Sequence, residues 1–188
     1  MTSFFRIFTV IPIAIILGLL VGAHTQWETE TNWVIGAGTG SIVVFPLLLM
    51  ILFRQKYPRW WFDWNLQLMR FATRVTAYLS LLRDEYPSTD EEQAVHLEMK
   101  YPVVKAELNQ WLPLVKWFLA IPHYIVLFFM DIGVIVCVII AWFSILFTGR
   151  YPKDFFTFVE GVFRWEVRVL GYAFLMVTDK YPPFGLEP

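Results

Sequence analysis

LVKWFLAIPHYIVLFFMDIGVIVCVIIAWFSILF, residues 114–147, is the stretch that decides the fold of this chain. It carries one lysine, one aspartate and one histidine, and is otherwise dominated by aliphatic and aromatic residues. A membrane-spanning helix needs about 17–25 apolar residues. We interpret the stretch as two antiparallel spans, 114–130 and 132–147, joined by a tight turn at Asp131. Because both spans are short, a re-entrant hairpin stays open as an alternative.

Two further apolar stretches, 7–23 and 33–53, lie in the first part of the chain. We expect the first to be a retained helix rather than a cleaved signal, because it is longer than a usual signal core. The composition agrees, since 57% hydrophobic residues, 19% aromatic residues and a mean hydropathy of +0.55 exceed what soluble domains show. The sequence therefore predicts an all-α, polytopic membrane protein with four transmembrane helices.

Charge is distributed unevenly over this four-span arrangement. All fifteen cationic residues fall on one side of the membrane, whereas the opposite connections, 24–32 and the turn at Asp131, contain acidic residues and no Lys or Arg. Loops rich in Lys and Arg stay in the cytoplasm. This pattern predicts a multi-pass protein of the cytoplasmic membrane with both termini in the cytoplasm.

The sequence repeats itself with a shift of 94 residues, at which Tyr57-Pro58 corresponds to Tyr151-Pro152. Further matches are Arg70 with Arg164, Arg74 with Arg168, Tyr78 with Tyr172 and, after one inserted residue, 84–87 with 179–182. We predict a duplication with two parallel hairpin repeats. The first covers 1–87 with its hairpin at 7–53, and the second covers 111–188 with its hairpin at 114–147.

A long charged helix is predicted after each Tyr-Pro pair, at 60–83 and at 155–177. Charges in the middle of both segments would each cost a few kcal/mol in a bilayer, on the order of 3 kcal/mol on the insertion scale. Polar residues recur every three or four positions, opposite a wide aromatic face. We therefore expect both helices to lie flat at the cytoplasmic interface. The resulting candidates for lipid or partner contact are Arg70, Arg74, Tyr78, Arg164, Arg168 and Tyr172.

These arginines have two interpretations. They could extend toward water and lipid phosphates from the interface. They could also form ion pairs between helices or subunits, or contact a partner protein. The repeated spacing indicates that the positions matter to each unit, but it does not distinguish the two uses.

A linker at 88–110 joins the repeats and contains one candidate β-strand. Apolar and polar residues alternate over 94–101, which is the period of a strand. A lone strand is not stable. It would have to pair with the chain's own C-terminal segment or with another protein.

Catalytic signatures are missing from the sequence. It has no glycine-rich phosphate loop, no HExxH or CxxC motif, and a single cysteine, Cys137. His123, near the end of an apolar stretch, is the candidate ligand residue, and it could either bind haem or chlorophyll or make a polar packing contact. We predict that the protein is not an enzyme and holds no metal and no cofactor, while a bound lipid is compatible with its surface.

Residues 111–126, 142–152, 164–169 and 178–184 together resemble the DUF4389 family of bacterial membrane proteins. The resemblance is strong over 94–185, and the first half is similar to a divergent copy that keeps the Tyr-Pro and Arg positions. Since the activity of that family is unknown, the resemblance implies a bacterial inner membrane but no catalytic residue.

These features favour a small, non-catalytic integral membrane protein that serves as an accessory or assembly subunit of a larger membrane complex. The alternative is a lipid-binding or transport-related membrane protein. The expected partners are membrane lipids and other membrane protein subunits or a second copy of the chain, and no nucleic acid.

Overall fold

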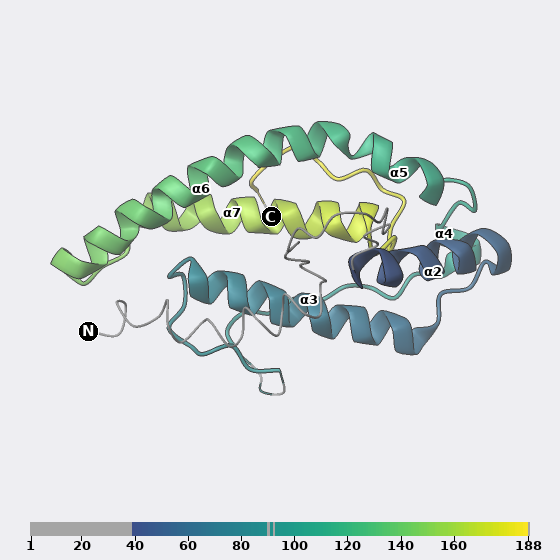
Figure 1. Cartoon of the computed structure of the whole chain (residues 1–188), viewed down its shortest axis with the longest axis horizontal. Coiled ribbons are helices and arrows are strands. Elements are labelled where there is room, and N and C mark those ends of the chain that lie inside the picture. The colour runs from purple at the N-terminus through teal and green to yellow at the C-terminus, as the bar shows by residue number, and fades with distance from the viewer. Residues whose placement is uncertain (1–38, 90, 92, 188) are drawn as a thin grey trace, which may run out of the picture.

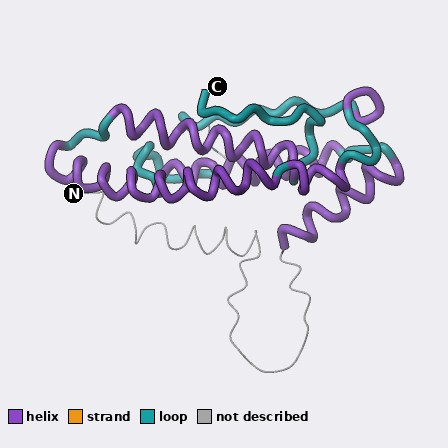
Figure 2. Tube along the Cα trace, turned by 90° about the horizontal axis from the view of Figure 1, so that it is seen from above, coloured by secondary structure: helices purple, strands orange, loops and turns teal. Residues whose placement is uncertain are grey.

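The computed structural model describes residues 39–89, 91 and 93–187, in which helices are joined by irregular segments without any strand. The helices are α2 (Thr39–Arg54), α3 (Arg59–Leu79), α4 (Val104–Glu107), α5 (Pro113–Leu119), α6 (Ile121–Thr148) and α7 (Lys153–Ala173). Figure 1 shows α6 and α7 running antiparallel, with α3 on the far side of α7 and α2 near α5. Figure 2 shows the elongated shape of this arrangement from above. The described residues are consistent with the predicted all-α class.

A narrow apolar seam joins α6 to α7. The buried residues of α6 are His123, Leu127, Val134 and Ala141, with Met130 and Cys137 partly buried between them. Those of α7 on the same seam are Val159, Val162, Val169 and Ala173. Alternating steps of three and four are the spacing of knobs-into-holes packing between neighbouring helices. Gly133 brings the two helices close, because a Cβ there would lie 3.3 Å from the ring of Phe158.

The predicted hairpin at 114–147 is wrong, because α6 continues through Asp131 without a turn. The break lies at Ala120, between α5 and α6. Pro122 explains its position, since a proline has no N–H to donate and its ring collides with the carbonyl four residues earlier, here that of Phe118. Asp131 does not require a turn because it faces Glu166 of α7, and one glycine inside a helix costs only about 1 kcal/mol.

The prediction of four transmembrane helices is also wrong for the described residues, where α6 is the one helix long and apolar enough to cross a bilayer. Its 28 residues exceed the number a bilayer core needs, whereas α2 has 16 residues and contains Pro46. The predicted span at 7–23 and the beginning of the span at 33–53 lie outside the described residues. By length and composition, α6 is an indication of membrane association.

Charged residues are distributed around α6 differently from the predicted pattern. Lys116 precedes α6, and Arg150 and Lys153 follow it, so cationic residues flank both ends of the one candidate span. The one-sided distribution of charge depended on a turn at Asp131. The multi-pass arrangement and the placement of both termini in the cytoplasm therefore lose their support.

The candidate strand at 94–101 is wrong, because this segment has no regular secondary structure. It finds no neighbouring strand among the described residues, and its backbone is held by side chains instead. Arg70 donates from Nε to the Leu97 carbonyl at 2.8 Å, and the Tyr101 hydroxyl donates to the Tyr57 carbonyl. Residues 94–101, which we call the irregular strip, are thus held against α3 without regular secondary structure.

Helices form where the two charged segments were predicted, but both end earlier than expected. α3 ends at Leu79 and α7 at Ala173. Beyond each end a residue other than glycine takes a left-handed backbone, Leu81 with φ 62° and Met176 with φ 52°. Such a conformation reverses the chain and stops a helix. Their location at a membrane interface stays a prediction.

Candidate functional site

The polar residues of the second half converge on residues 174–187, which we call the C-terminal strap. The strap runs back along α7 and crosses α5 and α6 (Figure 1). Gly161 makes room for it, because a Cβ at this position would lie 2.9 Å from Cβ of Leu186. Arg168 holds the same part of the strap by donating to the carbonyls of Gly185 at 2.5 Å and Glu187 at 2.8 Å. Packing and hydrogen bonds therefore fix the strap to α7.

A buried ion pair ties the strap to α5. The side chain of Lys116 is 0% exposed, and its Nζ lies 2.8 Å from a carboxylate oxygen of Asp179 and 2.7 Å from the Thr178 carbonyl. Tyr172 lies beneath this ammonium group, with its ring centroid 5.1 Å from Nζ. Burial lowers the pKa of Lys116, while the hydrogen bond and charge of Asp179 oppose that shift. A buried charge of this kind needs its partner to persist.

His123 is the second point at which the strap is held. It is fully buried, and its Nδ1 accepts a hydrogen bond from Nε1 of Trp165 at 3.1 Å. The ring of Phe184 stacks on the imidazole with centroids 3.9 Å apart and an interplanar angle of 13°. Tyr181, also from the strap, lies 4.8 Å away. His123 is thus a packing and hydrogen-bonding residue enclosed by aromatic rings.

The predicted contact residues of the first half hold the segment that follows α3, much as Arg168 holds the strap. Arg74 donates from Nη1 to the Ser88 carbonyl at 2.7 Å, and Arg70 binds the Leu97 carbonyl. The ring of Tyr78 packs edge-on against Tyr86 at 6.0 Å. Arg164 differs from these three, because it pairs with the exposed carboxylate of Glu160 on its own helix, 2.7 Å away.

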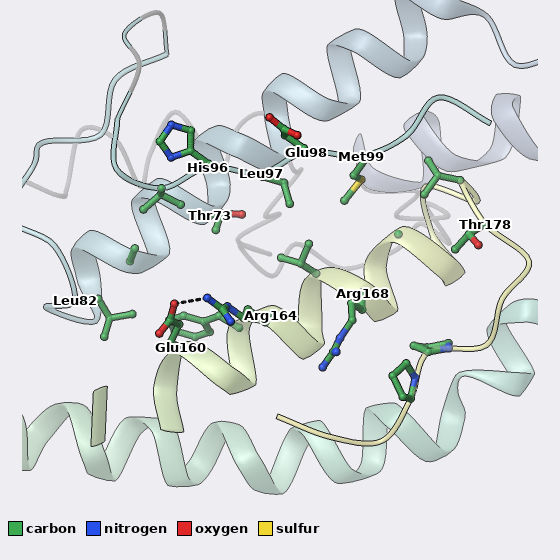
Figure 3. A pocket seen from close by; sticks show the side chains of 18 of the residues that line it. Thr73, Leu82, His96, Leu97, Glu98, Met99, Glu160, Arg164, Arg168 and Thr178 are labelled. Carbon is green, nitrogen blue, oxygen red and sulfur yellow. Dashed lines mark hydrogen bonds and ion pairs between the residues drawn. The ribbon is translucent and has the colours of Figure 1, made fainter. Parts of the chain in front are cut away.

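A cavity of about 860 Å³ lies between α3 and α7. Residues 94–99 of the irregular strip and residues 177–183 of the strap complete its walls. Figure 3 shows Thr73, His96 and Leu97 on one side of this space and Glu160 and Arg164 on the other. The polar stripe predicted on α7 therefore faces this cavity through Glu160, Arg164 and Arg168, whereas α3 lines it with Thr73 and Ala77 and not with its arginines.

Residues 113–185 match the family model described as a domain of unknown function, DUF4389. This confirms the resemblance for the C-terminal part of the chain. The matched region begins at the first residue of α5 and ends in the strap. It contains both halves of the buried ion pair and the cluster of His123, Trp165 and Phe184. No curated protein and no solved structure matches the chain.

The buried ion pair in the DUF4389 region was not predicted from the sequence. In the sequence, Lys116 is one cation within the apolar stretch 114–147, and Asp179 belongs to the repeated segment 179–182. Their pairing depends on the path of the strap, which no local pattern indicates. No group of three or more His, Cys, Asp or Glu residues suited to a metal occurs in the part of the chain that the structure describes.

The DUF4389 region also places two carboxyl groups against each other within the α6–α7 seam. Glu166 of α7 occupies a seam position between Val162 and Val169, and its side chain is hydrogen-bonded to Asp131 of α6. Burial, together with the charge of Asp131 and this hydrogen bond, raises the pKa of Glu166 to about 7. A polar pair inside an apolar seam fixes the register of two helices.

The raised pKa of Glu166 predicts how stability depends on pH. Above about pH 4.5 the unfolded state loses a proton that the folded state retains until about pH 7. The free energy of unfolding should therefore fall as the pH rises through this window. We expect Glu166→Gln to be more stable than the wild type near pH 8, because the neutral amide avoids that cost.

Thermal melting of the detergent-solubilised protein at about pH 4 and about pH 8 checks this expectation. The variant and the wild type should melt at similar temperatures in acid and diverge in base. Glu160→Gln is the matched control, since Glu160 is on the same helix but its side chain is 41% exposed. An equal pH response of wild type and Glu166→Gln would contradict the assignment.

Proposed function

We propose that the protein is a small, non-catalytic membrane protein that acts as an accessory or assembly subunit of a larger complex in a bacterial inner membrane. The observation that carries this proposal is the uncovered apolar surface of α6. Phe128, Ile132, Ile135, Val136, Ile139, Phe143 and Phe147 of this helix are all exposed. A continuous apolar surface of this size is expected to contact lipid or another protein rather than water.

The use of the polar groups supports a structural role over a catalytic one. Lys116, Arg70, Arg74 and Arg168 all donate to backbone carbonyls of this chain, and His123 accepts from Trp165. Cationic groups that are committed to these carbonyls are not available to bind a substrate, and the His123 ring is enclosed by Trp165, Tyr181 and Phe184. What α6 offers a partner is a face of exposed aliphatic and aromatic side chains.

We also propose that the chain arose by duplication of one unit consisting of a helix, a Tyr-Pro turn, a long helix and a returning segment. α3 and α7 are both 21 residues long, and the first and last residues of α7 lie 94 positions after those of α3. Each helix follows a proline with nearly the same backbone angles. The pair Tyr57 and Phe62 is edge-on at 5.8 Å, as is the pair Tyr151 and Phe156.

The residues with left-handed backbone support the same proposal. Gln55 and Gly149, 94 positions apart, end α2 and α6 with φ 47° and 70°. Leu81 and Met176 follow α3 and α7 at corresponding positions once the single inserted residue is counted. Left-handed residues other than glycine are uncommon, so their agreement is not a matter of composition.

Substitution on α6 tests its contact with the membrane. Ile135 is 60% exposed, and placing a lysine there should cost about 3 kcal/mol if the residue lies in hydrocarbon. We expect Ile135→Lys to lower the fraction of protein that resists alkaline extraction from membranes. Val103→Lys, which changes a loop residue of similar exposure, 55%, should leave that fraction unchanged. Equal retention of both variants would contradict a lipid-facing α6.

The accessory role itself is tested by the state of the protein after gentle solubilisation. Native mass spectrometry of the chain released in a mild detergent should show it bound to other subunits in a fixed stoichiometry. A monomer that carries no protein partner under conditions that preserve known complexes of the same membrane would contradict the proposed role.

A further inference from the structure

The cavity between α3 and α7 has no part in the fold or in the proposed function as described so far. Its volume of about 860 Å³ falls within the range of roughly 300–1,000 Å³ that small-molecule sites occupy. It lies where the two long amphipathic helices face each other, away from the uncovered surface of α6. A molecule bound in this cavity would therefore be separate from whatever covers the exposed face of α6.

The walls of this cavity are mainly apolar. Both helices contribute aliphatic or aromatic side chains, and the irregular strip and the strap add more; the residues are Ala77, Leu82, Val95, Leu97, Met99, Phe163, Val167 and Val177. A glycine widens the space on the α7 side, where a Cβ on Gly171 would lie 3.8 Å from the end of Met99. Such walls suit a hydrocarbon chain, because burying apolar surface contributes about 25 cal/mol per Å².

Positive charge exceeds negative charge around the cavity. Four cationic residues line it, Arg83, Arg164, Arg168 and Lys180, against the two carboxylates of Glu98 and Glu160. Within the described parts of the chain, neither Arg83 nor Lys180 forms an ion pair. The lining therefore favours a ligand that carries negative charge.

Arg164 is the residue best placed to bind that charge. Its side chain is half exposed and bonded through Nη2 to Glu160, while a guanidinium group has five N–H donors. In Figure 3, Leu82 lies beside Arg164 and Glu160 at one end of the space, and Met99 lies at the other. Arg83 follows Leu82 in the chain, whereas Arg168 lies farther along α7, toward Met99 and Thr178.

We propose that this cavity binds a single-chain anionic amphiphile, with the acyl chain between α3 and α7 and the carboxylate or phosphate on Arg164. A carboxylate or phosphate oxygen forms strong charge-assisted hydrogen bonds with a guanidinium group. Arg168 already donates through both Nη atoms to the strap carbonyls of Gly185 and Glu187, and its Nε, which has no partner, is buried. Arg164 alone among the four repeated arginines is not bound to a backbone carbonyl of the described chain.

Equilibrium binding to the full-length, delipidated protein tests this site. The protein is kept in a steroid-based detergent, which has no acyl chain to compete, and receives radiolabelled oleate, lysophosphatidylglycerol or oleyl alcohol. We expect saturable binding of one molecule per chain for oleate, lysophosphatidylglycerol or both, and at least tenfold weaker binding of the neutral alcohol. The comparison of the two anions distinguishes a fatty acid from a phospholipid derivative.

Two substitutions separate the charge from the cavity. Arg164→Gln should weaken binding of the anionic probe about tenfold and leave that of the alcohol unchanged. Arg150→Gln, an exposed cation outside the cavity, is the matched control and should bind the anion as the wild type does. Val167→Trp, which fills the cavity from α7, should weaken both probes.

Thermal melting confirms that each variant is folded before its binding is compared. Equal affinity for the anion and the alcohol, an Arg164→Gln variant that binds like the wild type, or no saturable binding of either anion would each overturn the proposal. Binding that survives Val167→Trp would place the ligand elsewhere and overturn it as well.

Discussion

Asp179→Asn is expected to lower the free energy of unfolding by about 3–5 kcal/mol, because it leaves a buried ammonium group without its counter-charge. The side chain of Lys116 is 0% exposed and lies 2.8 Å from the Asp179 carboxylate. Asp179 also accepts a hydrogen bond from the backbone N–H of Asn109 at 2.5 Å. The carboxylate thus joins the start of the strap to α5 and to the loop before it.

A double-mutant cycle isolates the pair from the other contacts of its members. Lys116→Met should destabilise the protein less than Asp179→Asn, because the Asp179 side chain is 20% exposed and its Oδ2 still accepts a hydrogen bond from the backbone N–H of Asn109. The double variant should be more stable than the sum of the single losses predicts. Chemical unfolding followed by tryptophan fluorescence measures all four proteins.

The exposed pair of Lys100 and Glu107 provides the control. Its nitrogen and oxygen are 2.7 Å apart, about as close as in the buried pair, but the side chains are 79% and 40% exposed. Water screens such a pair, so Glu107→Gln should leave the unfolding midpoint unchanged. Equal losses from Glu107→Gln and Asp179→Asn would show that burial does not decide the strength of the buried pair.

The sequence predicts α3 and α7 where they form, although not α6, and the physical reason lies in the Tyr-Pro pairs that precede both helices. Pro58 and Pro152 both take the extended conformation that precedes a helix, and both helices begin at the next residue. The amphipathic spacing then continues along each helix and predicts its length approximately. Their ends were harder to predict, because Leu81 and Met176 are not residues that usually adopt a left-handed backbone.

The error at Asp131 shows why a polar residue in an apolar run does not by itself predict a turn. The partner of Asp131 is Glu166, which lies far along the chain on a different helix. One signal was present in the sequence, since Glu166 falls off the polar stripe of α7 and onto its apolar seam. A charged residue on the buried side of a helix requires a polar partner on the facing helix.

The repeated arginines show the corresponding limit for the candidate site. Their spacing indicated positions that matter, but Arg74 and Arg168 bind backbone carbonyls of the segments that follow α3 and α7. Whether an arginine meets a lipid phosphate or a carbonyl depends on the path of the chain beyond the helix. That path is set by long-range contacts such as Phe184 on His123, which no local pattern contains.

Trp165→Ala is the second substitution with a large expected effect, a loss of about 3–5 kcal/mol in the free energy of unfolding. Trp165 is 3% exposed in the core between α6 and α7. Its ring lies edge-on to Phe184 with centroids 5.8 Å apart, and its Nε1 holds His123. The substitution creates a cavity and also removes the donor that orients the imidazole under the strap.

Two comparisons separate these contributions. Trp165→Phe keeps most of the apolar volume but leaves Nδ1 of His123 without its donor, so a smaller loss of about 1–3 kcal/mol is expected. Trp111→Ala removes a tryptophan that is 65% exposed and should change stability little. The strap should become more sensitive to protease in Trp165→Ala than in Trp165→Phe, because the alanine removes the packing against Phe184. Equal stability of Trp165→Ala and Trp111→Ala would mean that the aromatic cluster does not hold the strap to α6 and α7.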